Sequence, residues 1–141
     1  MKTKKPMMIR YDLTTDTSEW LPQKEPFKFI DKVVSMKFPL MWKKRIDITP
    51  QDLVGSEIIC KFFVDEKLGF FEGHFPENPI LPGVIQIEMM AQATSFTMRR
   101  LWSYKEFKKR KIALVGIENM RFKKPVFPNE TLTIHTKYVK F

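Results

Sequence analysis

The fold of this chain is decided by residues 69–102, which read GFFEGHFPENPILPG (69–83) and then VIQIEMMAQATSFTMRRLW (84–102). The first part holds three of the ten prolines and three of the five glycines, a density at which no helix or strand survives. Because it also carries several large apolar residues, we expect a rigid loop that packs against the rest of the protein. The second part has no Pro or Gly, and Pro82-Gly83 supplies a start signal, so we predict a helix over 84–101.

The predicted helix is apolar on nearly every side, which is typical of a buried helix. Segments rich in β-branched and aromatic residues flank it. Residues 58–64, 112–117 and 131–141 predict strands, while 27–34 fits either a strand or a helical turn. An antiparallel sheet wrapped around one long central helix would explain why that helix has no polar face, so we expect an α+β protein.

Composition excludes several classes of protein. The length of 141 residues favours one domain, and 43% hydrophobic residues with 13 Phe exclude a disordered chain. A single cysteine, Cys60, excludes a disulfide scaffold and a multi-cysteine zinc site. No apolar run approaches the roughly 18 residues of a membrane span, and no secretory signal follows the basic N-terminus, so we expect a cytoplasmic protein.

The charge balance points to an acidic partner. The formal net charge is +9, which favours nucleic acid, anionic lipid or an acidic protein, and composition alone does not choose among them. Because the chain carries no nucleic-acid motif, we expect no nucleic-acid partner. Residues 1–22 show no sustained periodicity and form an expected N-terminal extension, ahead of a domain at 23–141.

Two side chains are candidates for acid–base chemistry. His74 lies in the rigid loop, and Glu88 lies on the predicted helix, where a buried carboxylate is costly unless it is paired or functional. Plainer interpretations stay open at this point, since a lone loop histidine is usually structural and a glutamate near a helix end can face solvent. The second histidine, His135, lies mid-strand and is interpreted as a sheet or surface residue.

Gly83 adds a third element. A glycine at a helix N-terminus lets a ligand approach the backbone, where free N–H groups and the helix dipole stabilise an oxyanion. The plainer interpretation is that Pro82-Gly83 only starts the helix. Taken together, a base, an acid and an oxyanion donor are what removal of a proton beside a thioester and loss of a β-hydroxyl require.

A resemblance sharpens this hypothesis. The stretch FFEGHFPENPILPGVIQIEMMAQA (70–93) strongly resembles GHFPxxPxxPGVxxxExxAQ, the signature of FabZ-type (3R)-hydroxyacyl-[acyl-carrier-protein] dehydratases. MRFKKPVFPNETL (120–132) and PFKFIDKVV (26–34) are similar to the family's RFRRPVxPGDxL and PFLLVDRV, so the resemblance runs from about Leu21 to Phe141. It puts the family's catalytic pair on His74 and Glu88, and Glu rather than Asp at 88 looks like the FabZ branch rather than the related FabA branch.

The resemblance implies a hotdog fold and the dehydration of a 3-hydroxyacyl thioester on acyl carrier protein to the trans-2-enoyl product, in fatty-acid biosynthesis. It implies no metal or redox cofactor, because the phosphopantetheine arm belongs to the carrier protein. It also implies a homodimer or a trimer of dimers, in which each site takes His74 from one subunit and Glu88 from the other, with an acyl tunnel along their interface. Gly83 and Val84 would bind the thioester, supported by Gln92, Phe75 and Pro82, with Gln92 orienting Glu88.

Acyl carrier proteins are strongly acidic, which gives the basic residues of this chain a candidate role. The expected carrier-protein contacts are Arg99, Arg100, Arg121, Lys123 and Lys124. A solvated basic face is the plainer interpretation of the same residues.

Both ends of the chain depart from the family pattern. Residues 1–22 are extra, and the family's two C-terminal strands are expected to be missing, which would expose an unpaired edge on the last strand. A strand at Met7–Tyr11 or a partner chain can fill that gap. Two other functions stay open: a FabA-like or polyene-pathway dehydratase, and a non-catalytic hotdog subunit that binds acyl carrier protein.

Overall fold

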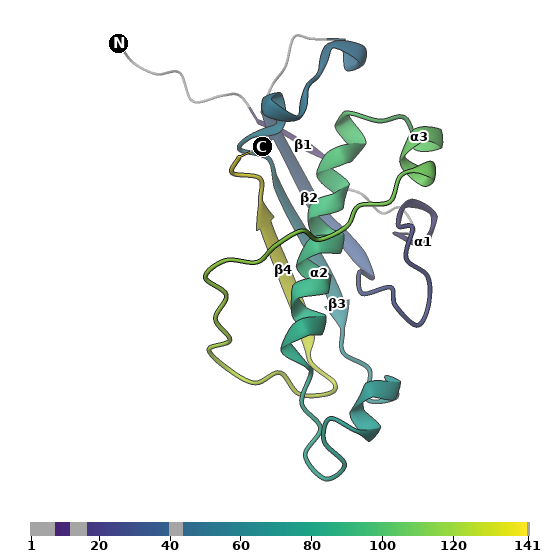
Figure 1. Cartoon of the computed structure of the whole chain (residues 1–141), viewed down its shortest axis with the longest axis vertical. Helices are drawn as coiled ribbons and strands as arrows, with labels where there is room; N and C mark the ends of the chain where they lie inside the picture. The colour runs from purple at the N-terminus through teal and green to yellow at the C-terminus, as the bar shows by residue number, and fades with distance from the viewer. Residues whose placement is uncertain (1–7, 12–16, 40–43, 141) are drawn as a thin grey trace.

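The computed structural model describes residues 8–11, 17–39 and 44–140 (Figure 1). Their strands are β1 (Met8–Tyr11), β2 (Lys32–Pro39), β3 (Glu57–Phe63) and β4 (Thr131–Lys137). Their α-helices are α1 (Thr17–Trp20), α2 (Gly83–Ser95) and α3 (Tyr104–Lys109), and their 3₁₀ helices are η1 (Arg45–Asp47), η2 (Pro50–Leu53), η3 (Gly69–Glu72) and η4 (Phe96–Arg100).

The four strands form one antiparallel sheet in the order β1-β2-β3-β4, and α2 runs along one face of it (Figure 1). Alternate residues of β3, Ile58, Cys60 and Phe62, are buried beneath the helix, as the two-residue period of a strand requires. They meet Met89 and Ala93 of α2 in one apolar core. The predicted α+β class, with an antiparallel sheet against one central helix, is confirmed.

The helix itself differs from the prediction in two ways. The α-helix ends at Ser95 and continues as the 3₁₀ helix η4 to Arg100. It is also not buried on every side, because the sheet covers only one face: Met89 and Gln92 are buried, whereas Val84 is 70% exposed. Part of its remaining apolar surface lies along the two cavities of the candidate site: Ile87, Met90 and Ala91 line one, and Val84 lines the other.

The strand predicted at 112–117 is wrong. These residues form no regular element, and the apolar side chains of Ile112, Leu114, Val115 and Ile117 are all exposed. A strand is stable only where a neighbour accepts and donates its backbone hydrogen bonds, and within the described ranges no strand lies beside this segment.

Other boundaries move less. The ambiguous segment 27–34 becomes a strand only from Lys32, and the strand predicted over 131–141 ends at Lys137. The proline-rich loop contains one short 3₁₀ turn, η3, where no regular element was expected. The sequence analysis also did not predict α3, although Ser103 and Glu106 match the Ser-x-x-Glu capping-box motif. The structure forms that capping box at the start of α3.

The N-terminal residues add a strand to the sheet. Within Met7–Tyr11, residues 8–11 pair with β2 from Met8 against Pro39 to Tyr11 against Met36, while Met7 lies outside the described residues. The strand therefore forms, but on the edge opposite β4, so it does not fill the gap expected there. No strand of the described chain pairs with the outer edge of β4. The boundary at residue 22 stays a prediction.

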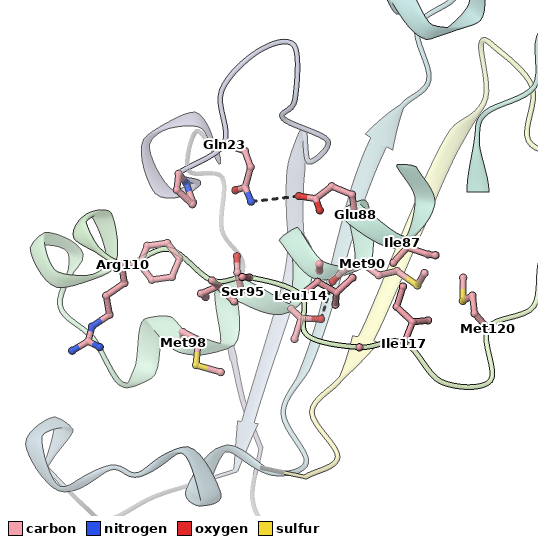
Figure 2. Close-up of a pocket in the computed structure, with 17 residues that line it drawn as sticks. Gln23, Ile87, Glu88, Met90, Ser95, Met98, Arg110, Leu114, Ile117 and Met120 are labelled. Carbon is pink, nitrogen blue, oxygen red and sulfur yellow. Dashed lines mark hydrogen bonds between the residues drawn. The ribbon is translucent and has the colours of Figure 1, made fainter. Parts of the chain in front are cut away.

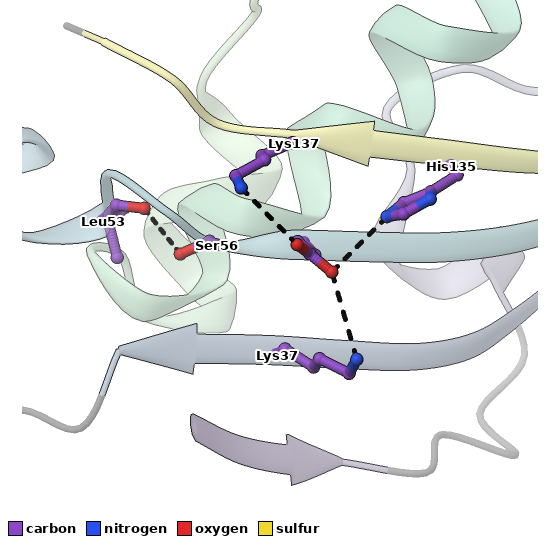
Figure 3. Close-up of polar contacts among 6 residues, drawn as sticks. Lys37, Leu53, Ser56, His135 and Lys137 are labelled. Atoms are coloured by element: carbon purple, nitrogen blue, oxygen red, sulfur yellow. Dashed lines mark hydrogen bonds and ion pairs between the residues drawn. The ribbon is translucent and has the colours of Figure 1, made fainter. Parts of the chain in front are cut away.

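The face of the sheet that points away from α2 carries a small ion-pair cluster centred on Glu57 (Figure 3). Its carboxylate lies 4.0 Å from Lys37, 3.8 Å from Lys137 and 3.5 Å from Nε2 of His135. The three basic side chains are 41–58% exposed and that of Glu57 is 25% exposed, so water reaches and screens each pair, which contributes at most about 1 kcal/mol. His135 thus lies on the surface of the sheet, as its sequence position suggested.

None of the helices in the described ranges combines the length and the apolarity that crossing a bilayer requires.

Candidate active site

The loop before α2 holds His74 in a defined orientation. Its backbone N–H donates to the Phe70 carbonyl (3.0 Å), and its own carbonyl accepts from the Ile80 N–H (3.0 Å). The ring nitrogen Nδ1 lies 2.8 Å from the Ile80 carbonyl oxygen, and the ring stacks on Phe75 with centroids 4.1 Å apart. Because a carbonyl oxygen only accepts, the hydrogen of the neutral ring lies on Nδ1. Nε2 is then left with a lone pair and can act as a base.

The N-terminus of α2 offers backbone donors beside this loop. The amides of Ile85 and Gln86 donate to the Pro82 carbonyl, whereas those of Gly83 and Val84, in the first turn, have no acceptor within the helix. Half-buried Pro82 caps the helix and has no N–H of its own. The two amides of Gly83 and Val84, at the positive end of the helix dipole, are suited to bind a developing negative charge.

Phe122 covers the backbone of Gly83. A Cβ placed on residue 83 would lie only 2.6 Å from Cζ of that ring, so glycine is required by the close approach rather than by its backbone angles. The ring itself is 50% exposed and belongs to the irregular segment between α3 and β4. Leu81 anchors this segment, because its N–H donates to the Val126 carbonyl (2.8 Å).

These groups surround one cavity of about 420 Å³, within the size range of small-molecule sites. The structure brings His74, Gly83 and Val84 together in its wall, with Lys123 and Lys124 at the same cavity. Both lysines are exposed. The predicted base, the predicted oxyanion donors and two of the predicted carrier-protein contacts are therefore neighbours.

Glu88 is held by two glutamine side chains. Gln92, one turn further along α2 and only 1% exposed, donates from Nε2 to Oε1 of Glu88 (2.9 Å). The same amide is locked by the loop at 23–29, since it donates to the Phe27 carbonyl (2.9 Å) and accepts from the Phe29 N–H (2.8 Å). Gln23, which the sequence analysis did not single out, donates to the same Oε1 at 3.4 Å (Figure 2).

Glu88 and Gln23 lie at an apolar cavity of about 370 Å³ that follows α2 (Figure 2). Its wall is built from Ile87, Met90 and Ala91 of α2, from Met98 of η4, and from residues of the irregular segment 112–117. In this single chain Glu88 lines this cavity and His74 lines the other one. The candidate acid and the candidate base therefore lie in different cavities of the same chain.

The remaining predicted residues occupy different surroundings. Phe75 is 48% exposed and packs on His74, and Arg121 is exposed beside the His74 cavity. The guanidinium of Arg99 lies 3.3 Å above the Trp20 ring, and that of Arg100 lies 5.5 Å from the Phe38 ring. Both arginines are engaged within the protein. Carrier-protein contacts at all five basic residues stay predictions.

A central helix laid on an antiparallel sheet, with a histidine in the loop before the helix and a glutamate on it, is the arrangement expected of a hotdog-fold dehydratase. Residues 50–140 match the profile of the ApeI-like family, described as ApeI dehydratase, and the chain belongs to that family.

Curated relatives agree with this assignment. The chain is 31% identical over 125 residues to the 3-hydroxyacyl-[acyl-carrier-protein] dehydratase FabZ of Clostridium perfringens (strain SM101 / Type A), covering 89% of this chain and 76% of the relative. It is 31% identical over 126 residues to FabZ of Lactococcus lactis subsp. cremoris (strain SK11), covering 89% and 74%. It is also 37% identical over 114 residues to the bifunctional enzyme LpxC/FabZ of Chlorobaculum tepidum, covering 81% of this chain and 21% of that protein. The protein is therefore a dehydratase, an enzyme of the hydro-lyase class.

Proposed function

We propose that this protein converts (3R)-hydroxyacyl-[acyl-carrier-protein] to trans-2-enoyl-[acyl-carrier-protein] and water, as a step of fatty-acid biosynthesis. The observation that carries the proposal is the presence, in one chain, of two side chains that are each held in a fixed orientation by hydrogen bonds. One is a histidine oriented through Nδ1 beside two helix N-terminal amides, and the other is a glutamate held on the same helix by two amide side chains. The names of the FabZ relatives support the same reaction.

In the proposed mechanism the thioester carbonyl oxygen accepts hydrogen bonds from the Gly83 and Val84 amides, which makes the C2 proton acidic. Nε2 of His74 removes that proton, and the electron pair left on C2 becomes the new double bond. Glu88 donates its proton to the 3-hydroxyl oxygen as the C3–O bond breaks, so that water leaves. Acid, base and amide donors account for every step, and the phosphopantetheine arm is part of the substrate.

We further propose that each complete site combines two subunits of a homodimer. His74 and Glu88 line different cavities of one chain, so a second chain that docks its His74 cavity against the Glu88 cavity would complete the pair. An isologous dimer would then carry two equivalent sites. The trimer of dimers and the cytoplasmic location expected from the sequence stay predictions.

The proposed macromolecular partner is the acidic acyl carrier protein. Lys123 and Lys124 are exposed at the His74 cavity, where the arm of the carrier protein would have to enter. Positive charge at an entrance attracts an acidic protein and raises its association rate. Arg121 extends the same basic surface.

Turnover by the purified chain tests this function. The assay follows the release of trans-2-enoyl product from (3R)-hydroxyacyl carrier protein over a range of acyl lengths. Because a lost general acid or base costs about 10²–10⁴-fold, His74→Ala and Glu88→Gln should each lower turnover at least about a hundredfold. His135→Ala replaces the other histidine on the far face of the sheet and should leave turnover unchanged. Wild-type rates from folded His74→Ala protein would refute the assignment.

A further inference from the structure

Gln23 contacts the candidate acid from a loop 65 residues away in the sequence. Its Nε2 donates to Oε1 of Glu88, the same oxygen that accepts from Gln92 (Figure 2). Within the described part of the chain no hydrogen bond uses Oε2 of Glu88. With two donors on Oε1, the proton of a neutral Glu88 belongs on Oε2.

The backbone of the loop determines where Gln23 lies. Gln92 binds the loop at both Phe27 and Phe29, as described above. On the other side of Gln23, Leu21 is buried in the core and its N–H donates to the Thr17 carbonyl (3.0 Å). The position of Gln23 therefore does not depend on its own long hydrogen bond to Glu88.

The side-chain carbonyl oxygen of Gln23, Oε1, is unusual because it is buried without a hydrogen-bond donor among the described residues. A buried oxygen left without a donor costs about 1–3 kcal/mol, so its persistence points to a partner that arrives with a ligand. The nearby hydroxyls do not fill this role, because Thr94 donates to the Met90 carbonyl and Ser95 to the Gln92 carbonyl. All of these side chains line the Glu88 cavity.

We propose that Gln23 binds the hydroxyl group that the reaction removes. In the free chain Oε1 of Gln23 is shielded, so the side-chain amide of Gln23 turns when the substrate binds. Its Oε1 then accepts the O–H of the substrate 3-hydroxyl, while Oε2 of Glu88 gives its proton to the same substrate oxygen. When the C3–O bond breaks, its electron pair stays on that oxygen, which keeps its own hydrogen, gains the Glu88 proton and leaves as water. This role rests on the proposed function. It makes Gln23 the residue that distinguishes a 3-hydroxyacyl thioester from the saturated thioester of equal length.

The test measures binding, so that turnover does not obscure it. In the His74→Ala background, calorimetry gives the Kd of a (3R)-3-hydroxyacyl pantetheine thioester and of the saturated acyl pantetheine thioester of the same length. One hydrogen bond of about 1–1.5 kcal/mol predicts that the hydroxylated ligand binds roughly tenfold more tightly. Adding Gln23→Met, which keeps the size of the side chain and removes both polar atoms, should abolish this preference and leave the Kd of the saturated ligand unchanged.

Two controls make the result specific. Gln51→Met makes the same change at an exposed glutamine of η2 and should keep the preference. Gln23→Leu is a second apolar variant and should behave as Gln23→Met does, with both variants checked by thermal melting. The proposal is overturned if the parent shows no preference, if Gln23→Met retains it, or if both ligands weaken equally. If the unmodified chain does not turn over 3-hydroxyacyl carrier protein, the proposed reaction is refuted, whether or not the hydroxylated ligand binds more tightly than the saturated one.

Discussion

Replacing Gly83 with alanine should damage the enzyme through Phe122. The new Cβ would lie 2.6 and 2.7 Å from two atoms of the Phe122 ring, closer than real Cβ atoms approach their neighbours, and 3.0 Å from a third. Overpacking typically costs about 1–3 kcal/mol. Because the ring is half exposed and on an irregular segment, it can move, so we expect the low end of that range, roughly 1 kcal/mol or about 3–5 °C in Tm. The displaced ring and the new methyl group hinder the substrate carbonyl from reaching the backbone amides of Gly83 and Val84. We therefore expect kcat/KM to fall at least about tenfold, as when an oxyanion interaction is weakened.

A double-mutant cycle isolates this contact. Phe122→Ala removes the ring, so Gly83→Ala should cost much less stability in the Phe122→Ala background than in the wild type. Gly69→Ala is the matched control, because a Cβ there meets nothing within 4 Å, and it should leave kcat/KM near the wild-type value. Urea melts give the free energies of unfolding, and initial rates on the 3-hydroxyacyl thioester give kcat/KM. Strictly additive effects of the two substitutions would refute the reasoning from the ring contact.

Two further predictions concern charge and burial. Reversing the charge with Lys123→Glu and Lys124→Glu should lower turnover of the carrier-protein substrate far more than turnover of a small pantetheine thioester. It should also lessen the salt dependence of turnover with the carrier-protein substrate. Equal losses on both substrates would contradict a docking role. Burial raises the pKa of the Cys60 thiol from 9.0 to about 12, so its contribution to stability is complete below pH 9 and is lost as the pH rises towards 12. The difference in unfolding free energy between wild type and Cys60→Ala should therefore change by about 1.4 kcal/mol per pH unit above 9, and a constant difference would contradict it.

Local patterns predicted the centre of this molecule well. Pro82-Gly83, followed by a largely apolar run without Pro or Gly, predicted α2 to within a residue at its start, and enrichment in β-branched and aromatic residues predicted β3. The spacing along the helix also placed Gln92 one turn from Glu88, where the hydrogen bond is found. These features depend on residues close together in the chain, which is why periodicity and turn chemistry find them.

The features that the sequence did not predict depend on contacts between residues far apart in the chain. Residues 112–117 have the composition of a strand, but pairing decides whether a strand forms, and composition does not report pairing. The contact of Gln23 with Glu88 joins segments 65 residues apart, and the packing of Phe122 on Gly83 joins a loop to a helix end. No local signal predicts either contact. The short helix α3 is different, because its capping box was present in the sequence and could have been found.

The most direct test of the whole account mixes two inactive variants. If each site takes its base from one subunit and its acid from the other, a dimer of His74→Ala and Glu88→Gln chains has one site with both defects and one with neither. After complete exchange at equal concentrations, half of the dimers are mixed, so turnover of the 3-hydroxyacyl carrier protein should recover to about a quarter of the wild-type rate. Turnover no higher than the sum of the two separate variants, with exchange demonstrated by differently tagged chains, would contradict the shared dehydratase site.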